Sequence, residues 1–409
     1  MLRIAWITPY LPAPGNSGGR IRIERLARGL SSHELVLFCR LAPEDPSICE
    51  LPAAELALWS RVHWSLPDRS RLTACRTWQA VATQRGADPP DRRRPQVLGW
   101  RTPRLARSFP SSLQWALEDE DRRRPFDLAV VEHCYAMEAL VRLERAPIVL
   151  SEHNVESDYW LGEFRRTRQL GRLIDYARWH RYERCCWRRA DRVTMVTERD
   201  AARVRLVRPH GVGVVPNGVA TERFRYLPPS HRQGSDILFV GVMSYEPNVQ
   251  AAIRLARRVM PRVRRRVPDA RLTIAGRDPG PRVRALANER VRVTGAVDDL
   301  AALFDRHAAY ANLVAFGGGR SLKTLEPLCA GLPLVASRFA IRGYELQPRR
   351  HLLLATHDDD VAEALCRVLT ERAGFDAMAE QAHAWVQQHD WGIYARRFAD
   401  FVTAACLGA

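Results

Sequence analysis

Two blocks of alternating strand-like and helix-like segments constrain the fold of this 409-residue chain more than any other feature of its sequence. In each block, short apolar runs typical of buried parallel strands are separated by segments whose apolar residues recur at helical spacing. This alternation predicts a doubly wound parallel sheet, with helices on both faces, for each block. The strands expected in the first block are residues 2–8, 34–39, 127–131, 147–151, 192–196 and 212–216, with a first helix at 20–30.

The second block begins near Asp236 and predicts a second domain. Its expected strands are residues 237–240, 271–275, 291–294, 310–315 and 334–336, and its expected helices are 249–266, 299–307, 322–330 and 361–372. An α/β chain of two such domains has its ligand site at the carboxyl ends of the strands, so we expect the domains to face a central cleft.

The composition of the connecting segments sets the expected boundaries. We expect an N-terminal Rossmann-like domain at residues 1–224, a polar, proline-rich linker at 225–235 and a C-terminal Rossmann-like domain at 236–390. Within the first domain, an arginine- and proline-rich stretch at about residues 85–125 is expected to be a loop-rich insertion. A last helix within residues 391–409 is expected to pack back on the N-terminal domain.

Charge is the most unusual part of the composition. The net charge is +17, and of 63 lysine and arginine residues only Lys323 is a lysine. The arginine bias is typical of a GC-rich genome and needs no functional explanation. The net excess still predicts an acidic partner, for which anionic lipid, nucleotide phosphates and nucleic acid are the candidates.

Other totals indicate a cytoplasmic protein. No run of about 18 apolar residues is present, so no membrane span is expected. The N-terminal stretch MLRIAWITPYLPAPG is more typical of a buried first strand followed by a loop than of a signal peptide. Nine cysteines, including the adjacent Cys185 and Cys186, lack metal-ligand spacing and are expected to be reduced thiols.

A glycine triplet lies between an expected strand and an expected helix of the second domain. The triplet consists of Gly317, Gly318 and Gly319. Glycines let backbone amides approach a phosphate closely, and a helix N-terminus adds partial positive charge. Arg320 and Lys323 add full charges, and Glu326, one turn on, could accept hydrogen bonds from two ribose hydroxyls. The alternative is a glycine turn with solvated basic residues.

The position of the lone lysine favours the phosphate-binding alternative. If arginine has replaced lysine wherever the exchange is tolerated, Lys323 marks a place that needs a compact ammonium group. Arg277, which follows the expected strand 271–275, is a weaker candidate for the same contacts.

Polar residues also follow strands of the first domain. Gly18 and Gly19, between the first strand and the first helix, could present amides to a phosphate or an acceptor, or form a plain turn. His153, directly after the strand 147–151, could hydrogen-bond a ligand hydroxyl or polarise an acceptor, or be a satisfied structural histidine. Glu132 and His133 have the same placement, but a structural role is favoured for them.

Basic and aromatic residues are interleaved between Leu161 and Arg192, where ten arginines occur. On a helix, such a stretch could lie against anionic lipid headgroups or stack on nucleic acid. A solvated helix with an aromatic core stripe is the alternative for part of it. The aromatic residues concerned are Phe164, Tyr176, Trp179, Tyr182 and Trp187.

The segment GGGRSLKTLEPLCAGLPLVAS resembles the nucleotide-binding segment of family-four retaining glycosyltransferases of the GT-B fold. Other segments are similar in the same order, and they cover nearly the whole chain except about residues 50–125. They are ITPYLPAPGNSGGRIR, SEHNVES, ADRVTMVTERD, VVPNGVATERF, ILFVGVMSYEPNVQAA and RLTIAGRDP.

The resemblance implies roles for the matching residues. Glu326 corresponds to the ribose-binding glutamate, and the glycine triplet with Lys323 would hold the donor phosphates. Gly18 and Gly19 would bring amides to the diphosphate from the other domain, and His153 would lie near the transferred sugar. Members of the family are generally metal-independent and need no cofactor, because basic groups and helix dipoles stabilise the leaving diphosphate.

The sequence also departs from the family pattern. The first of two glutamates, commonly separated from the second by seven intervening residues, would fall at Gly318, and Ala220 replaces a frequent aspartate. The arginine that often ends a Gly-Gly-Thr-Arg variant is displaced by one at Arg320. The loop of residues 241–247 lacks the basic residue often found there.

The sequence therefore favours a retaining glycosyltransferase of the hexosyltransferase class. His153, Lys323 and Arg320 are the expected catalytic residues. The expected donor is a nucleoside-diphosphate sugar, and the expected acceptor is a saccharide, a lipid-linked saccharide or another hydroxyl compound in polysaccharide, glycolipid or glycoconjugate synthesis. A peripheral association with an anionic inner-membrane surface is expected through residues 165–192, and nucleic acid is the disfavoured partner. The alternatives are an epimerase or a phosphorylase on the same fold, or a degenerate homologue that binds anionic polymers.

Overall fold

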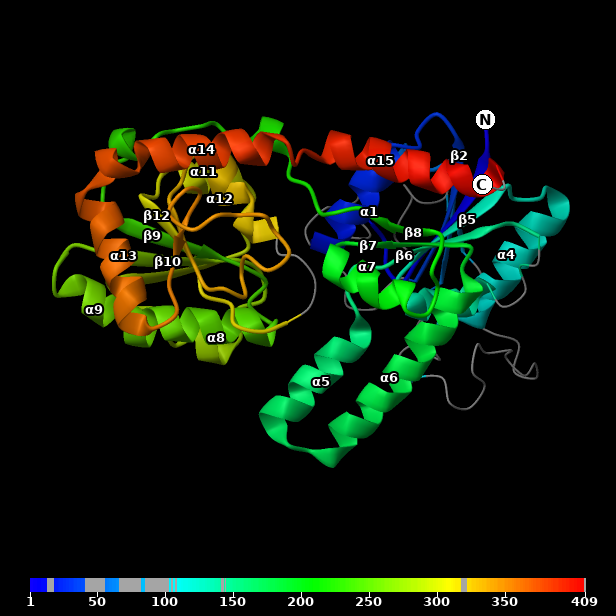
Figure 1. The fold of residues 1–409 in the computed structure, drawn as a ribbon, viewed down its shortest axis with the longest axis horizontal. Helices are drawn as coiled ribbons and strands as arrows, with labels where there is room; N and C mark the ends of the chain where they lie inside the picture. Colours follow the sequence, from blue (N-terminus) through cyan, green and yellow to red (C-terminus); the bar gives the residue numbers. More distant parts are fainter. Residues whose placement is uncertain are drawn as a thin grey trace. The chain divides into compact units, whose positions relative to one another are not determined.

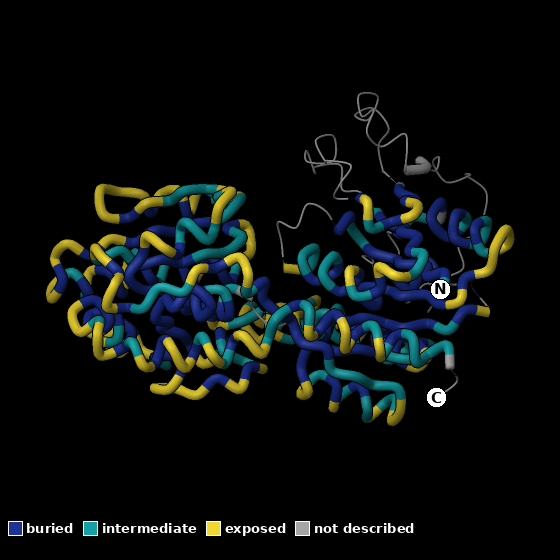
Figure 2. Tube along the Cα trace, turned by 90° about the horizontal axis from the view of Figure 1, so that it is seen from above, coloured by how far each residue is buried: buried dark blue, intermediate teal, exposed yellow. Residues whose placement is uncertain are grey.

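The computed structural model describes residues 1–12, 18–40, 56–65, 82–84, 103, 106, 109–140, 143, 145–317 and 322–407. By their internal contacts these residues form two units. The first is Met1–Pro216 together with Gly392–Ala409, and the second is Asn217–Trp391. In each unit, buried stretches run through the interior and exposed stretches lie on the outside (Figure 2).

The first unit contains an eight-stranded sheet in the order β4-β3-β2-β1-β5-β6-β7-β8, and every neighbouring pair is parallel. All six residues of β1 are buried, as expected for a central strand covered on both faces. The strands are β1 (Arg3–Thr8), β2 (Glu34–Arg40), β3 (Arg61–Ser65), β4 (Ala82–Gln84), β5 (Leu128–Glu132), β6 (Ile148–Ser151), β7 (Arg192–Met195) and β8 (Val212–Val214).

Helices cover both faces of this sheet, and α5 and α6 form a hairpin that projects away from it (Figure 1). They are α1 (Gly18–Arg28), α4 (Ser111–Arg123), α5 (Glu156–Thr167), α6 (Leu170–Arg189), α7 (Glu198–Arg205) and α15 (Trp391–Thr403). The C-terminal helix α15 packs on the sheet of this unit, where the Phe398 ring lies 5.8 Å from the ring of Trp6.

The second unit contains a six-stranded parallel sheet in the order β11-β10-β9-β12-β13-β14. Its strands are β9 (Asp236–Val240), β10 (Arg271–Ala275), β11 (Val291–Gly295), β12 (Ala309–Asn312), β13 (Leu334–Ala336) and β14 (Leu353–Leu354). Its helices are α8 (Glu246–Arg254), α9 (Met260–Arg264), α10 (Pro281–Arg284), α11 (Leu300–Asp305), α12 (Glu326–Cys329), α13 (Asp358–Thr370) and α14 (Asp376–Gln387).

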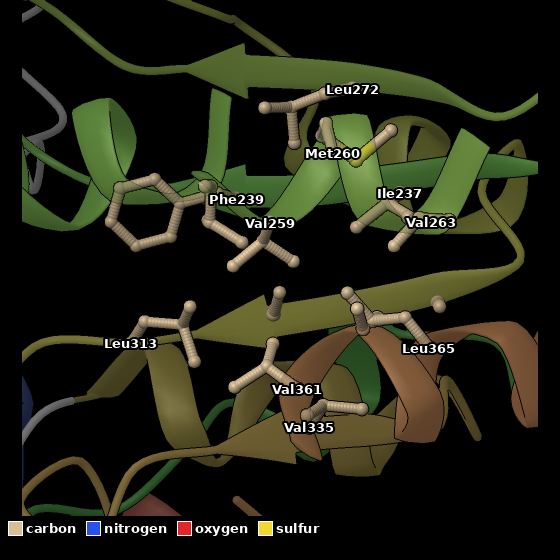
Figure 3. Packing of buried hydrophobic residues seen from close by; sticks show 14 of the residues in the cluster. Ile237, Phe239, Val259, Met260, Val263, Leu272, Leu313, Val335, Val361 and Leu365 are labelled. Atoms are coloured by element: carbon tan, nitrogen blue, oxygen red, sulfur yellow. The ribbon is translucent and has the colours of Figure 1, made fainter. Parts of the chain in front are cut away.

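The core of the second unit is formed by apolar side chains of the sheet and of the helices on it (Figure 3). Ile237 and Phe239 of β9 and Leu272 of β10 are fully buried beside Val259 and Leu365. Burial of each such side chain contributes about 1.5–3 kcal/mol, so the apolar runs that predicted these strands also stabilise the sheet.

The α/β class and the two parallel, doubly wound sheets expected from the sequence are confirmed, but several elements differ. Helix α4 lies inside the expected loop-rich insertion, because Leu113, Ala116 and Leu117 are buried at helical spacing among charged residues. The strands β3, β4 and β14 were not expected. The expected strand 310–315 ends at Asn312, and the expected helix 322–330 is divided into the 3-10 turn Leu322–Thr324 and α12.

The expected linker, residues 225–235, is grouped with the second unit. Arg232 is buried there, and its guanidinium donates hydrogen bonds to the carbonyl oxygens of Phe304 and His307 at 2.8 and 2.9 Å. The backbone nitrogen of Leu227 also donates to the carbonyl of Ala330 at 3.1 Å. These contacts hold the segment on the sheet that follows it.

Gly276 is the glycine of the second unit whose replacement should disturb the fold most. It has a φ of 140°, and a Cβ at this position would lie 1.8 Å from the carbonyl oxygen of Gly241. Gly276→Ala is expected to lower the free energy of unfolding by about 2–5 kcal/mol, because backbone strain and overlap add. Gly374→Ala, where a Cβ would meet no atom within 4 Å, is the matched control and should change it by less than about 0.5 kcal/mol. Equal denaturation midpoints for the two variants would contradict this close approach.

Candidate functional site

The strand order of the second sheet reverses between β9 and β12, which are paired neighbours. The chain leaves β9 towards one face and β12 towards the other, and sheets of this kind bind ligands at the carboxyl edge beside such a reversal. These loops are residues 241–245 after β9 and residues 313–321 after β12. Three of the residues that the sequence selected lie in or directly after the second loop: Gly317, Lys323 and Glu326.

Gly317 brings the backbone of the second loop against the first. Its φ is 130°, and a Cβ would lie 2.6 Å from the hydroxyl oxygen of Tyr245. Residues with a side chain rarely adopt this φ, so the conformation favours glycine here. The approach of its amide to a phosphate stays a prediction. Gly318, Gly319 and Arg320 lie outside the described residues.

Lys323 connects the two loops. Its ammonium group donates a hydrogen bond to Oδ1 of Asn248, and Nδ2 of Asn248 donates to the carbonyl of Val242 at 2.9 Å. The ammonium nitrogen also lies 5.6 Å from the centre of the Phe239 ring. Burial lowers the pKa of Lys323 to about 8, against the opposing attraction of Glu326. A bound anion would therefore stabilise the charged form of this lysine.

Glu326 is the first residue of α12 and lies in the same desolvated region. Burial raises its pKa to about 7, and the charges of Arg223 and then Lys323 oppose this rise. Arg223 comes from the 3-10 turn Thr221–Arg223, after the segment VVPNGVA. Burial thus weakens the charged forms of two groups of opposite charge that lie close together.

A buried hydrogen-bond chain fixes the backbone between these two charges. Thr324 is fully buried, and its hydroxyl donates to the carbonyl of Ala340 at 2.8 Å and accepts from Nδ2 of Asn312 at 3.2 Å. Asn312 is the last residue of β12. Lys323 and Glu326 therefore stand on either side of a residue anchored to the strand end.

Arg277 lies at the same edge of the sheet but apart from the charged pair. It follows β10, and its carbonyl oxygen accepts a hydrogen bond from the backbone nitrogen of Met243 at 2.8 Å. Its Nε lies 3.8 Å from Oδ2 of Asp278, and its side chain is 38% exposed. Within the described part of the chain, no contact joins Arg277 to Lys323 or Glu326.

The first sheet has the same reversal, between β1 and β5, and a second group of polar residues follows these strands. Gly18 and Gly19 are the first residues of α1. A Cβ on Gly19 would lie 2.2 Å from the hydroxyl oxygen of Tyr10 and 3.7 Å from Nδ1 of His153. The structure therefore brings Gly19 and His153 together at this edge of the first sheet.

His153 is held by a buried carboxyl group. Its Nε2 lies 2.8 Å from Oε2 of Glu132, which ends β5 and is fully buried. Burial raises the pKa of Glu132, while Arg22, His133, Ser151 and Trp6 stabilise its charged form. Burial, followed by the charges of His133 and Arg22, lowers the pKa of His153. The imidazole is thus favoured in its neutral form, with its Nδ1 edge facing the start of α1.

His133 belongs to the same cluster. It adopts a φ of 67°, which is unusual for a residue with a side chain, and its ring centre lies 4.0 Å from that of His153. Its Nε2 is 3.2 Å from the hydroxyl oxygen of Tyr10. Glu132 and His133 both contact the ring of His153, a candidate site residue, and His133 also contacts Tyr10. The structural role favoured for them therefore includes positioning this residue.

Glu152, the neighbour of His153, points into the core. Its carboxylate accepts hydrogen bonds from the backbone nitrogen of Cys134 at 3.1 Å and from the indole nitrogen of Trp187 at 3.2 Å. Successive residues leaving a strand face opposite directions, so one of this pair stabilises the fold while the other faces the edge of the sheet.

Sequence reasoning missed the residues that position the selected ones. Asn248, Tyr10, Arg22 and Arg223 each act on a site residue that is distant in sequence. The polar, buried positions of Asn248 and Arg22 inside otherwise apolar helical faces are the signals that could have identified two of them. Among the described residues, no three His, Cys, Asp or Glu side chains are grouped so that they could hold a metal ion.

Two sequence families match the chain. The family described as "Glycosyltransferase Family 4" matches residues 17–223, and the family described as "Glycosyl transferases group 1" matches residues 234–371. Among curated proteins, none matches the chain.

Solved structures share the fold across the whole chain. Sucrose-phosphate synthase from Thermosynechococcus elongatus superposes with a TM-score of 0.71 and 16% identity, covering 100% of both chains. Anabaena HepE in complex with UDP-glucose gives a TM-score of 0.64 and 12% identity, covering 98% of this chain and 99% of HepE. WaaG, a glycosyltransferase involved in lipopolysaccharide biosynthesis, gives 0.61 and 14%, covering 98% and 99%. At these identities the likeness shows the fold, which is GT-B.

The raised pKa of Glu326 has a consequence for stability. The folded state holds the proton of the Glu326 carboxyl group more tightly than the unfolded chain does. The contribution of this proton to the free energy of unfolding is therefore fully present below pH 4.5 and is lost as the pH rises through about 7. Glu326→Gln stays neutral, so it should melt close to the wild type at pH 5 and be more stable by about 1–2 kcal/mol at pH 8. Exposed Glu289→Gln is the control. An equal difference between variant and wild type at both pH values would contradict a desolvated carboxyl.

Proposed function

The chain belongs to glycosyltransferase family 4, and from this premise we propose that it is a retaining hexosyltransferase that uses a nucleoside-diphosphate sugar as its donor. The observation that carries the proposal is the desolvated pair of Lys323 and Glu326 beside the glycine loop at the switch point of the second sheet. A lysine whose charged form is destabilised by burial, next to a glycine with a φ of 130°, suits a diphosphate, because a bound anion would stabilise that charged form.

Lys323 and Glu326 have complementary parts in the proposed donor site. The ammonium group of Lys323 neutralises charge that develops on the diphosphate as the bond to the sugar breaks. The carboxylate of Glu326 accepts hydrogen bonds from the ribose hydroxyls. Gly317, with Gly318 and Gly319, presents backbone amides to the phosphates, and Arg320 and Arg277 supply further positive charge.

The first unit supplies the proposed sugar and acceptor side. The amides of Gly18 and Gly19 at the start of α1 contact the diphosphate, where the helix N-terminus favours negative charge. His153 hydrogen-bonds a hydroxyl of the transferred sugar through the ring edge that faces α1, while Glu132 fixes the other edge. The acceptor hydroxyl attacks from the face that the diphosphate leaves, and the leaving oxygen assists in removing its proton.

The pathway we propose is synthesis of a surface polysaccharide, a glycolipid or another glycoconjugate in the cytoplasm. The titles of two structures of the same fold support this class, because HepE was solved with UDP-glucose and WaaG is involved in lipopolysaccharide biosynthesis. No helix in the described ranges is long and apolar enough to cross a bilayer.

A thermal-shift screen against nucleoside diphosphates and their sugars tests the donor assignment. A true donor at 100 times its dissociation constant should stabilise the wild type by roughly 2.7 kcal/mol. Glu326→Ala should lose most of this stabilisation, whereas Glu289→Ala at an exposed position should retain it. The reaction products distinguish the alternative enzymes. Release of free sugar phosphate would indicate a phosphorylase, and an epimerised donor without an acceptor product would indicate an epimerase. Stabilisation by nucleic acid alone would indicate a degenerate, polymer-binding homologue.

Lys323→Arg should lose most of the turnover, and Lys323→Ala should lose more. A compact ammonium fits between Asn248 and the Phe239 ring, while a planar guanidinium needs more room and a forked partner. An interaction made chiefly in the transition state lowers kcat and kcat/KM together, by about 10²- to 10³-fold for one lost charge contact. Arg282→Lys, at an exposed site of the same unit, is the control for basic exchange. Wild-type transfer by Lys323→Arg would move the stabilisation of the leaving group to Arg320 or Arg277.

A further inference from the structure

A buried arginine of the first unit has a positive charge that the site described so far does not use. Arg22 is 1% exposed and belongs to the buried side of α1, together with Ile23 and Leu26. Its Nη1 donates a hydrogen bond to the carbonyl oxygen of Pro216 at 3.3 Å, which fixes one edge of the guanidinium. A fully buried arginine is rare unless a negative charge compensates it. A buried carboxylate is therefore expected near this side of α1.

The register of the first sheet places Glu132 on the face that α1 covers. Strand β1 pairs with β5 so that the side chains of Trp6 and Glu132 lie on the same face. Helix α15 packs on this face, because the ring of Phe398 lies 5.8 Å from that of Trp6. Directly after α1, a Cβ on Gly29 would lie 2.5 Å from the carbonyl oxygen of Ala395 in α15. The buried arginine of α1 and the buried carboxylate of β5 therefore share one layer between helices and sheet.

Arg22, Glu132 and His153 form a series from the interior of the unit to the edge of the sheet. Burial raises the pKa of Glu132, and the charge of Arg22 opposes this rise more than any other group does. Oε2 of Glu132 lies 2.8 Å from Nε2 of His153, whose side chain is 11% exposed. The other ring nitrogen, Nδ1, lies on the side where α1 begins, 3.7 Å from the position of a Cβ on Gly19. The charge of the carboxylate thus acts on one edge of a ring whose other edge faces the candidate site.

The charge of Glu132 decides which ring nitrogen of His153 carries the proton. An ionised carboxylate only accepts hydrogen bonds, so Nε2 must then carry the proton while Nδ1 keeps its lone pair. A protonated carboxyl group would donate to Nε2 instead, and the ring proton would then be on Nδ1. The two states differ by one proton taken from solvent, and they present opposite polarity at the edge of the sheet.

We propose that Arg22 is a positioning residue that keeps Glu132 ionised, so that Nδ1 of His153 is a hydrogen-bond acceptor at the edge of the first sheet. The group that this acceptor recognises is a hydroxyl that donates its proton, and a substituent without a proton, such as fluorine, binds less well. This recognition rests on the proposed function, in which a sugar hydroxyl meets His153, whereas the proton arrangement does not. A role of the ring as general base is disfavoured, because a second ring proton would add an uncompensated charge beside an ion pair that is already neutral overall.

Nitrogen NMR of the full chain with isotope-labelled histidine tests the proton arrangement without any substrate. The signals of His153 are assigned by their absence in His153→Gln. The wild type should show a protonated Nε2 and an unprotonated Nδ1. Arg22→Met should reverse this pattern, because burial without the compensating charge favours the neutral form of Glu132. Arg22→Lys, which keeps the charge, should retain the wild-type pattern.

Arg28→Met changes an exposed arginine of the same helix and is the matched control, which should leave the ring unchanged. Melting curves show whether each variant folds. A wild-type ring with its proton on Nδ1 would overturn the proposal even if Arg22→Met does not fold. An unchanged pattern in a folded Arg22→Met would also overturn it, because the arginine would then have a structural role alone.

Fluorinated sugars test the recognition step. The probes are UDP, UDP-glucose, which is the ligand in the HepE complex, and forms of UDP-glucose in which one sugar hydroxyl at a time is replaced by fluorine. One replacement should weaken binding to the wild type by about fivefold to tenfold. This loss should disappear in Arg22→Met, whose protonated Nδ1 does not repel fluorine, while both proteins should bind UDP equally.

An equal loss in the two proteins would contradict recognition through Nδ1. If the wild type binds none of these nucleotides, the proposed function fails in this respect, and the NMR result still decides for or against the role of Arg22.

Discussion

The reversal of strand order between β9 and β12 is the constraint on which the candidate site depends. The chain leaves these neighbouring strands towards opposite faces, and sheets of this kind bind ligands at the carboxyl edge beside such a reversal. Asn248 from one side and Lys323 from the other meet at this edge. The apolar core beneath, including Phe239, removes water from the lysine and so lowers its pKa. The strand order therefore positions Lys323, and the packing around this lysine then lowers its pKa.

Desolvation of this kind opposes stability and favours binding. An ammonium and a carboxyl group that lose water on folding destabilise the unliganded protein. An anion at Lys323 would restore a favourable charge interaction, so part of the binding free energy comes from this arrangement. The first unit shows the same principle, because Glu132 is buried beside Arg22 and holds the His153 ring in one orientation. In each unit, a buried residue holds a candidate site residue near the end of a strand: Asn248 holds Lys323, and Glu132 holds His153.

Local patterns predicted the parts of this structure that local physics determines. Apolar runs located β1, β5, β9 and β10 to within a residue or so, since buried parallel strands must be apolar on both faces. The glycine triplet and Lys323 were selected because backbone approach and charge are encoded in neighbouring residues. Helix α4 was missed because its buried face includes the polar residues Gln114 and Glu120, so the helix has few apolar residues among its charged ones. The partners Asn248 and Tyr10 were missed because only the folded sheet brings them to Lys323 and Gly19. The triplet residues Gly318 and Gly319, with Arg320, lie outside the described residues, so their roles remain predictions.

Proton uptake on ligand binding shows whether Lys323 contacts the diphosphate. At pH 8.5 Lys323, with a pKa of about 8, is mostly neutral in the free protein, and a bound diphosphate should restore its proton. Calorimetric titration with a nucleoside diphosphate, in two buffers of different ionisation heat, measures this uptake. The wild type should take up more than half a proton, because Lys323 is mostly neutral at this pH before binding, and Lys323→Met should take up none. Identical binding heats in the two buffers, or the same uptake in Lys323→Met, would contradict the assignment of Lys323 to the diphosphate.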